Sequence, residues 1–390
     1  MYNIATLNKI SSAGLCRFTD KYKIVDDIDS ATGIMVRSQD MLSMNFSENL
    51  LAIARAGAGV NNIPSGKCAE NGIVVFNTPG ANANAVKELV VSGLMLAARN
   101  LSDALSWAKT LKENTDDVAK AVEKGKSQFA GSELKGKTLG VIGLGAIGVL
   151  VANTARSLGM KVIGYDPYIT LHAAHELSNE IPVLFDLGDL LPRCDYVTIH
   201  VPANDATKGM LNSKRFDQMK EGAVLLNFSR DKLVNDDNLL GALNSGKISK
   251  YITDFPNNKV VGHEKIVCLP HLGASTAEAE DNCAVMAAEQ LMDYIENGNI
   301  TNSVNFPACS LGSMAGVKER ICILNKNVPS VIGKLTGILA DMDLNIGNMV
   351  NRSKGDFACT LIDIDTEADD AKLLRGISTI DGIIRTRLIK

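Results

Sequence analysis

Short apolar runs alternate with helical segments along the first hundred residues. Residues 33–36 (GIMV), 50–54 (LLAIA) and 73–76 (IVVF) have the length and composition of buried strands. Strands that alternate with helices imply a parallel sheet covered on both faces. Residues 86–99 predict a nearly all-apolar helix, buried between domains or subunits because it lacks a broad polar face. Residues 103–126 carry more charge and predict a solvent-facing helical connector.

A second alternating block begins at residue 137. Its order of strands and helices is typical of a doubly wound sheet. The predicted strands are 138–142, 161–165, 196–200, 223–227 and 266–269, with helices over 148–158 and 276–296.

The C-terminal end of the chain has a different pattern. Residues 301–317 are rich in Asn, Ser, Gly and Pro and predict a linker. Residues 318–390 then predict the order βαββαβ, which is a ferredoxin-like unit. We therefore divide the chain into four regions, which are residues 1–87 with 277–300, residues 88–276, residues 301–317 and residues 318–390.

Composition excludes several classes of protein. The 390 residues suggest two or three domains, and the net charge of −4 without a basic stripe argues against nucleic-acid binding. No apolar stretch is long enough to span a membrane. Eight cysteines without a CxxC pair suit reduced thiols, and the first residues do not have the pattern of a secretory signal. We therefore expect a cytoplasmic protein.

The strongest local motif is a glycine-rich loop between a strand and a helix. Gly143, Gly145 and Gly148 form GxGxxG directly after the predicted strand 138–142. The first glycine makes the tight turn, the second lets the backbone approach a pyrophosphate, and the third lets the helix and strand pack closely. Ala146 and Ile147 open the helix, where unpaired N–H groups favour phosphate. The motif predicts a dinucleotide site.

Asp166 supports this prediction. It lies 18 residues after Gly148, at the end of the next predicted strand. An acidic residue at that place hydrogen-bonds the ribose hydroxyls of the adenosine. Its charge would repel a 2′-phosphate, which favours NAD over NADP. A turn residue before proline is the structural alternative for Asp166 taken alone.

Arg230 and His271 suggest the reaction. Each follows a predicted strand, so each is expected at the carboxyl edge of the sheet, where doubly wound sheets bind ligands. A guanidinium can bind a carboxylate through two hydrogen bonds, and an imidazole can exchange a hydroxyl proton near neutral pH. Oxidation of a 2-hydroxy acid beside a nicotinamide needs both groups.

At these residues the chain resembles the D-isomer-specific 2-hydroxyacid dehydrogenases, and the resemblance covers nearly the whole chain. The matching segments are 36–38 (VRS), 55–60 (RAGAGV), 77–79 (NTP), 268–276 (CLPHLGAST) and 304–307 (VNFP). The resemblance implies an α/β fold with a flavodoxin-like substrate domain and a Rossmann-type NAD-binding domain. Residues 1–87 with 277–300 would form the first of these and residues 88–276 the second, with the substrate between them.

The substrate implied is 3-phosphoglycerate, oxidised with NAD to 3-phosphohydroxypyruvate in the first step of L-serine biosynthesis. Arg230 would bind the carboxylate and carbonyl, and His271 would be the acid/base. The resemblance places four residues in substrate-binding positions: Arg37, Arg55, Gly57 and Ala58. Arg37 and Arg55 would contact the phosphate, because arginine matches the oxygens of phosphate. A surface ion pair is the alternative for each arginine.

Further cofactor contacts follow from the same resemblance. They are Thr78, Pro202, Ser229 and Asp254, of which Asp254 would contact the nicotinamide amide. His200 is expected to be structural, or to act behind the residues that touch the cofactor.

The chain also departs from the pattern of the family. Family members usually pair the catalytic histidine with a glutamate, but Lys259 stands at the expected position here. Glu264 precedes His271 by seven residues and matches a different family position. Asn61 replaces a common aspartate and Asp231 a frequent glycine.

The C-terminal unit resembles an ACT domain, a small-molecule sensor. By position, Asn327 and Asn345 would bind L-serine between paired domains. Ser330 and Asn325 replace a glycine and a histidine of that pattern, so a domain that only holds subunits together is the alternative. A homodimer or homotetramer is expected, since the helix 86–99 and the ACT sheet both need partners.

Two other functions stay open. One is a related dehydrogenase of D-2-hydroxy acids, acting on glycerate or 2-hydroxyglutarate. The other is an NAD-sensing binding protein without catalysis, since a fold does not settle a function. No metal site is predicted, because His172 and His175 have no evident third ligand.

Overall fold

The computed structural model of the protein describes residues 1–390. The chain forms two compact units. Unit 1 contains Met1–Asn82 and Ala277–Lys390, and unit 2 contains Ala83–Thr276. The finer division into four regions given above stays a prediction.

Unit 1 begins with a five-stranded parallel sheet of order β2-β1-β3-β4-β5. This order is the flavodoxin-like arrangement that the family resemblance implies. Its strands are β1 (Tyr2–Leu7), β2 (Tyr22–Val25), β3 (Gly33–Val36), β4 (Ala52–Arg55) and β5 (Val74–Phe76), and its short helices are α1 (Ser12–Leu15) and α2 (Ser65–Glu70). The three predicted strands correspond to β3, β4 and β5, whereas β1 and β2 were not predicted.

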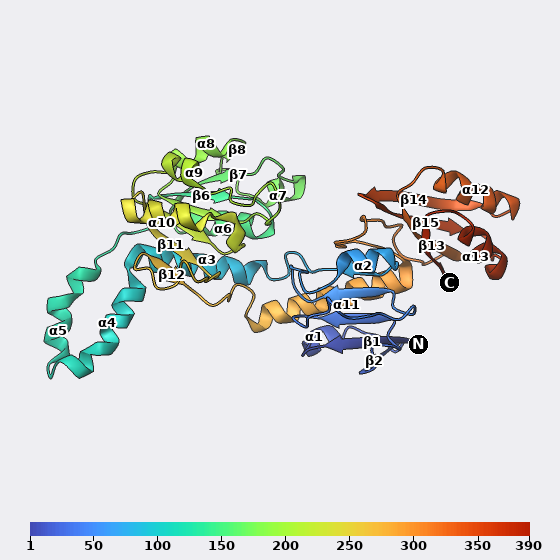
Figure 1. The fold of residues 1–390 in the computed structure, drawn as a ribbon, viewed down its shortest axis with the longest axis horizontal. Helices are drawn as coiled ribbons and strands as arrows, with labels where there is room; N and C mark the ends of the chain where they lie inside the picture. The colour runs from blue at the N-terminus through green and yellow to red at the C-terminus, as the bar shows by residue number, and fades with distance from the viewer. The chain divides into compact units, whose positions relative to one another are not determined.

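Helix α11 (Ala277–Asn297) packs against this sheet, although it lies about 200 residues after the last of its strands. Figure 1 shows it running along the sheet of unit 1. Leu291 and Tyr294 of α11 share one core with Ile4 and Phe76 of the sheet. Gly14 of α1 lies so close to α11 that a Cβ there would collide with the helix backbone. The first strands therefore depend on a helix that is made after unit 2.

The C-terminal domain has the predicted order βαββαβ, in an antiparallel sheet of order β14-β15-β13-β16. Its elements are β13 (Glu319–Lys326), α12 (Val331–Asp341), β14 (Ile346–Lys354), β15 (Phe357–Ile364), α13 (Asp370–Ser378) and β16 (Ile383–Ile389). Helices α12 and α13 cover one face through Leu335 and Leu373, which pack with Ile321 and Ile323. This confirms the ferredoxin-like fold.

The other face of this sheet is covered inside unit 1. Cys322 and Leu361 share the core that contains Tyr294 of α11. Arg387 donates to the carbonyl oxygen of Tyr294 (2.7 Å) and lies 4.4 Å from the centre of its ring. Arg385 donates to the carbonyl oxygen of Leu50 (2.7 Å). The chain itself therefore supplies the cover that the sequence pattern assigned to another subunit.

Unit 2 is built on a seven-stranded parallel sheet of order β12-β11-β10-β9-β6-β7-β8. This confirms the doubly wound, Rossmann-type arrangement. Its strands are β6 (Thr138–Ile142), β7 (Lys161–Tyr165), β8 (Val183–Leu184), β9 (Tyr196–Ile199), β10 (Ala223–Asn227), β11 (Ile248–Thr253) and β12 (Ile266–Cys268). The helices are α6 (Ala146–Ser157), α7 (Leu171–Glu176), α8 (Leu187–Leu190), α9 (Ser213–Gln218) and α10 (Asp236–Ser245).

Two kinds of helix precede this sheet. Helix α3 (Ala83–Arg99) packs on it, and a Cβ on Gly93 would collide with the ring of Phe228. The apolar helix thus finds a partner within its own unit. Helices α4 (Leu101–Asn114) and α5 (Val118–Gly125) form a helical arm that extends away from the sheet (Figure 1). Leu105 of this arm is 60% exposed and Val118 is 44% exposed.

None of the helices combines the length and apolar character that crossing a membrane requires.

Candidate active site

The glycine-rich loop joins β6 to α6. Gly143 has a φ of +92°, and a Cβ there would collide with the carbonyl oxygen of His200. A Cβ on Gly148 would collide with the carbonyl oxygen of Gly143, so only glycine lets the helix start here. A Cβ on Gly145, in contrast, would meet no atom within 4 Å. This open space beside the first N–H groups of α6 suits a pyrophosphate.

Asp166 is fixed next to this loop, directly after β7. Its Oδ2 accepts a hydrogen bond from the N–H of Leu144 (2.9 Å), and its Oδ1 accepts one from the N–H of Tyr168 (2.8 Å). The loop backbone therefore holds the carboxylate at the end of the strand, as the sequence predicts.

Arg230 lies after β10, at the same carboxyl edge of the sheet. Asn227 ends the strand and donates from Nδ2 to the carbonyl oxygen of Arg230 (2.8 Å). Ser229 donates from Oγ to the carbonyl oxygen of Ile199 in β9 (2.8 Å). The Arg230 guanidinium donates to the carbonyl oxygen of Ser229 (2.6 Å), and its side chain is exposed. The buried side chains of Asn227 and Ser229 thus fix the conformation of the backbone at Arg230.

His271 and Asp254 reach this edge from β12 and β11. The backbone N–H of His271 donates to the carbonyl oxygen of Asp254 (3.0 Å), and its ring lies 4.6 Å from that of Phe255. Asp254 is only 1% exposed. Its Oδ2 accepts from the N–H of Gly273 (3.1 Å), but its Oδ1 has no partner. Burial raises the pKa of Asp254, and the N–H of Gly273 and the charge of His271 partly oppose this.

Lys259 stands where family members have the glutamate that pairs with the catalytic histidine, and its side chain binds a different residue. Lys259 binds the carboxylate of Asp237, with its Nζ 2.7 and 2.9 Å from the two oxygens. The carboxylate that interacts with the charge of His271 is that of Asp254. Lys259, at the position of the usual glutamate, is therefore bound to Asp237, and what replaces the glutamate stays open.

His200 follows β9 beside the glycine-rich loop. Its Nε2 lies 3.0 Å from Oγ1 of Thr198, and its Nδ1 has no partner. Burial lowers the pKa of His200 to about 3. The ring is therefore neutral at physiological pH, which fits the structural role expected from the sequence.

Arg37 and Arg55 lie in unit 1, at the carboxyl ends of β3 and β4. The Nε of Arg55 donates to the carbonyl oxygen of Arg37 (3.1 Å). The guanidinium of Arg37 forms an ion pair with Glu280 of α11 (2.7 Å), in which the two side chains are 38% and 42% exposed. The structure brings the two predicted phosphate-binding arginines together and adds an acidic neighbour that the sequence did not indicate.

The other predicted residues of unit 1 hold the loop after β4. The N–H of Gly57 donates to Oγ1 of Thr78 (2.8 Å), and the N–H of Thr78 donates back to the carbonyl oxygen of Gly57 (3.1 Å). The Nδ2 of Asn77 donates to the carbonyl oxygen of Ala58 (2.6 Å). The side chain of Thr78 thus holds the predicted substrate loop in place. The role in cofactor binding that the resemblance gives to Thr78 stays a prediction.

The two predicted effector residues lie at opposite ends of β14. Asn327 donates to the carbonyl oxygen of Gly355, after the strand (3.1 Å), whereas Asn345 precedes the strand and donates to Asp365 (2.6 Å). A nine-residue strand separates them by roughly 30 Å. Asn327 lines a small pocket of about 160 Å³ with Asn325, Ser330 and Asn351, and Asn345 does not. The two residues cannot bind one small molecule within a single chain.

Comparison with known proteins gives the family. Residues 100–273 match the NAD-binding domain of the D-isomer-specific 2-hydroxyacid dehydrogenases. D-3-phosphoglycerate dehydrogenase from Haemophilus influenzae is 32% identical over 91% of this chain and 86% of its own length. The chain belongs to the D-isomer-specific 2-hydroxyacid dehydrogenases. The Escherichia coli protein of the same name is also 32% identical, over 95% of this chain and 90% of its own length.

A solved structure agrees with this membership. NAD+-bound 3-phosphoglycerate dehydrogenase from Entamoeba histolytica is 27% identical, with a TM-score of 0.61. The match covers 78% of this chain and 98% of that chain. The chain is thus an NAD-dependent dehydrogenase of the D-2-hydroxyacid family.

The residues of unit 2 fit NAD. The space over Gly145 would admit the pyrophosphate, and Asp166 lies where the adenosine ribose is bound in such folds. The partnerless Oδ1 of Asp254 is a buried acceptor that an amide N–H would satisfy. Pro202 and Ser229 lie just after β9 and β10 at the same edge. Individual cofactor contacts stay predictions.

Some residues of this site could not be found from the sequence. The sequence indicates Asn227 only as the end of a strand, although its buried amide fixes the Arg230 turn. Its signal was an amide in an otherwise apolar run. Glu280 gave no signal, because 243 positions separate it from Arg37.

A pair of alanine substitutions separates the roles of two glycines. Gly148→Ala should destabilise unit 2 by about 1–3 kcal/mol, because its Cβ collides with the loop backbone. Gly145→Ala should leave stability nearly unchanged but weaken NADH binding about ten-fold, because its methyl group enters the pyrophosphate space. Thermal unfolding without cofactor and NADH fluorescence titration measure the two effects. Equal losses of stability in both variants would contradict the packing argument.

Proposed function

We propose that the protein oxidises D-3-phosphoglycerate to 3-phosphohydroxypyruvate with NAD, the first step of L-serine biosynthesis. The observation that carries the proposal is the gathering of Arg230, His271 and Asp254 at the carboxyl edge that also bears the glycine-rich loop. The curated relatives named D-3-phosphoglycerate dehydrogenase, which match over most of the chain, support the choice of substrate.

Each residue at this edge has a distinct task. Arg230 binds the substrate carboxylate through its planar donors and so orients C2. His271 takes the proton of the C2 hydroxyl as the C–H bond breaks. NAD, when bound, accepts the hydride from C2. Asp254 holds the carboxamide of the nicotinamide and so fixes the face that the substrate meets.

In this proposal Arg37 and Arg55 bind the phosphate end of the substrate. They follow or end adjacent strands, and the Arg55 guanidinium donates to the backbone carbonyl oxygen of Arg37. Gly57 belongs to this arrangement, because a Cβ there would collide with the guanidinium of Arg55. Ala58 continues the same loop.

The test is NADH formation with D-3-phosphoglycerate, D-glycerate and D-2-hydroxyglutarate. We expect turnover of the phosphorylated acid only, and loss of turnover in Arg230→Ala. Preference for D-glycerate or D-2-hydroxyglutarate would keep the roles of Arg230 and His271 but refute those of Arg37 and Arg55. Failure to oxidise any of the three would refute the proposal.

Neutralising the acidic neighbour of Arg37 should improve recognition of phosphate. In Glu280→Gln the Arg37 guanidinium loses its ion pair, so KM for D-3-phosphoglycerate should fall about two- to five-fold with kcat unchanged. Steady-state kinetics measures this, with Glu278→Gln on the same exposed helix turn as the control. A KM that stays constant, or falls equally in the control, would contradict the assignment of Arg37.

We further propose that the C-terminal domain binds L-serine in the pocket beside Asn327. The support is a buried acceptor in that pocket: Oδ1 of Asn325 has no hydrogen-bond partner, and the residue is 2% exposed. The ammonium group of an amino acid would satisfy it. Because Asn345 lies at the far end of β14, its role in binding requires a second chain.

Calorimetric titration with L-serine tests this proposal. Wild type should bind L-serine and not D-serine, and Asn325→Leu should abolish binding while NADH formation continues. Lack of heat with wild type, or unchanged binding in Asn325→Leu, would refute the site.

We also propose that the protein is a cytoplasmic homo-oligomer. All eight cysteines are free, which suits a reducing compartment. The helical arm supports the assembly, because Leu101, Leu105 and Val118 are exposed on it and α5 buries no residue of its own. Light scattering of wild type and of Leu105→Glu would test it, since the variant should shift toward the monomer.

A further inference from the structure

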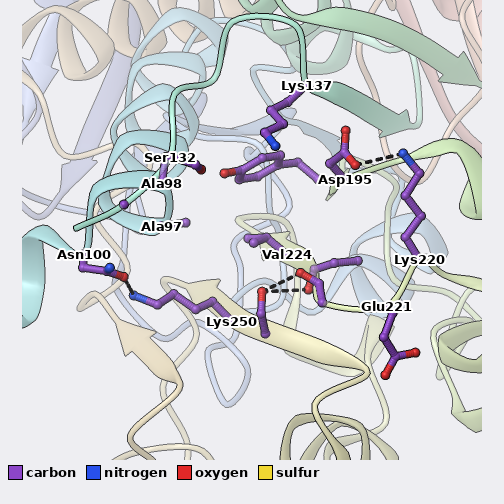
Figure 2. Close-up of a pocket in the computed structure, with 15 residues that line it drawn as sticks. Ala97, Ala98, Asn100, Ser132, Lys137, Asp195, Lys220, Glu221, Val224 and Lys250 are labelled. Carbon is purple, nitrogen blue, oxygen red and sulfur yellow. Dashed lines mark hydrogen bonds and ion pairs between the residues drawn. The ribbon is translucent and has the colours of Figure 1, made fainter. Parts of the chain in front are cut away.

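A second pocket lies at the amino-terminal ends of the unit 2 strands, whereas the glycine-rich loop lies at their carboxyl ends. It has a volume of about 420 Å³ and is formed where β6, β9, β10 and β11 begin. The side chains used below that line it are Asn100, Ser132, Lys137, Asp195, Lys220 and Lys250 (Figure 2). No residue assigned to catalysis or to the cofactor lines it.

Positive charge exceeds negative charge at this pocket. Both oxygens of Asp195 are occupied, Oδ1 by Lys220 (2.8 Å) and Oδ2 by the N–H of Thr138 (2.8 Å). Glu221 is exposed, turns away from the lysines in Figure 2 and lies 3.5 Å from Lys247. Among the three lysines of the pocket, only Lys220 forms a salt bridge with a carboxylate, although the charge of Lys137 also acts on Asp195.

The other two lysines form no ion pair with a carboxylate. The ammonium group of Lys250 donates to the amide oxygen of Asn100 (2.5 Å), which carries no charge. The ammonium group of Lys137 forms neither an ion pair nor a hydrogen bond. Both side chains are half-buried, so their charges are less well solvated than those of fully exposed lysines. Such ammonium groups at a concave surface favour an anion, because each is a compact point charge with three donors.

We propose that this pocket binds a small dianion, of the phosphate or dicarboxylate class, through Lys137 and Lys250. The hydroxyl of Ser132 is the uncharged donor on the remaining side. A dianion would give Lys137 and Lys250 the salt bridges that neither forms within the chain, where Asp195 is bonded to Lys220. The volume of the pocket suits an anion of a few heavy atoms together with its bridging waters.

The position of the pocket also suggests what the anion would do. Asn100 lies at the start of the helical arm with a φ of +51°, and its Nδ2 donates to the carbonyl oxygen of Ala130, where the chain returns from the arm (3.1 Å). The N–H of Ser132 donates to the carbonyl oxygen of Ala98 (2.8 Å). An anion held by Lys137 and Lys250 would therefore join the base of the arm to the sheet edge.

The test uses the full-length protein saturated with NADH and with excess D-3-phosphoglycerate, a combination that cannot react, so that both the glycine-rich loop and the substrate arginines are filled. Calorimetric titrations with inorganic phosphate and with malonate, at constant ionic strength, distinguish the two sources of dianion. We expect one of them to bind wild type and to bind the double variant K137Q/K250Q at least about ten-fold more weakly. Absence of binding by both anions in wild type would overturn the proposal.

Matched variants locate the effect. Lys135→Gln removes one exposed positive charge two residues from Lys137 and should leave binding unchanged. Ser132→Asp keeps every lysine but adds a carboxylate, and should abolish binding by repulsion even if the double variant fails to fold. Wild-type affinity in Ser132→Asp, or an equal loss in Lys135→Gln, would show that the anion binds elsewhere. A crystal soaked in selenate should show anomalous density between Lys137 and Lys250, and density only at Arg230 or Arg37 would refute the site.

Discussion

Replacing His271 with asparagine is expected to lower kcat for D-3-phosphoglycerate oxidation about 10²- to 10⁴-fold, because the substrate hydroxyl loses its proton acceptor. Asparagine is chosen for the backbone. His271 has a φ of +43°, in the left-handed region, where asparagine is better tolerated than other residues with a side chain. Its N–H would still donate to the carbonyl oxygen of Asp254. Stopped-flow measurement of NADH formation gives the rate of the chemical step.

A second histidine of unit 2 serves as the control. His263 lies 3.4 Å from Asn244, is half-buried and lies outside the proposed site. His263→Asn should retain wild-type kcat, and both variants should bind NADH normally. A kcat within a few-fold of wild type in His271→Asn would remove the acid/base role from this residue.

Removing Asp363 should give the largest loss of stability, about 3–5 kcal/mol. The Arg320 side chain is fully buried and forms two hydrogen bonds with the Asp363 carboxylate, of 2.6 and 3.1 Å. Its third nitrogen donates to the carbonyl oxygens of Asn297 and Gly312, both at 2.8 Å. In Asp363→Ala the guanidinium stays buried without a counter-charge. Urea unfolding followed by circular dichroism measures the loss.

Two further variants test the cause. Asp370→Ala breaks an exposed pair with Lys390 and should cost no more than about 1 kcal/mol. The double variant R320M/D363L removes both buried charges and should recover much of the stability, because the penalty belongs to the unpaired charge. If D363A and D370A were equally stable, the burial argument would be wrong.

The sequence predicts those features of the protein that local patterns determine. The loop Gly143–Gly148 is predictable because its three glycines have a fixed spacing between a strand and a helix, although the contact that requires glycine at 143 is with the distant His200. Arg230 and His271 were found because each directly follows an apolar strand, and parallel strands bring their carboxyl ends to one edge. The order βαββαβ was found from periodicity alone.

Other features depend on contacts between distant segments. Strand β11 (ISKYIT) was missed because Ser249 and Lys250 interrupt its apolar pattern, and their polar groups are satisfied by Gly222 and Asn100. The pairing of Arg37 with Glu280 depends on how α11 docks. The cover of the C-terminal sheet depends on the same helix. No local periodicity encodes such docking.

The docking of α11 also sets an order of events during synthesis. The strands β1 to β5 leave the ribosome before unit 2, but the helix that buries Ile4 and Phe76 follows only after all of residues 83–276. At about 5–20 residues per second, that delay is roughly 10–40 s. Unit 2 can close on itself during this interval, whereas the opening segment waits with an uncovered apolar face. During this interval the segment β1 to β5 is thus exposed to chaperones or to aggregation.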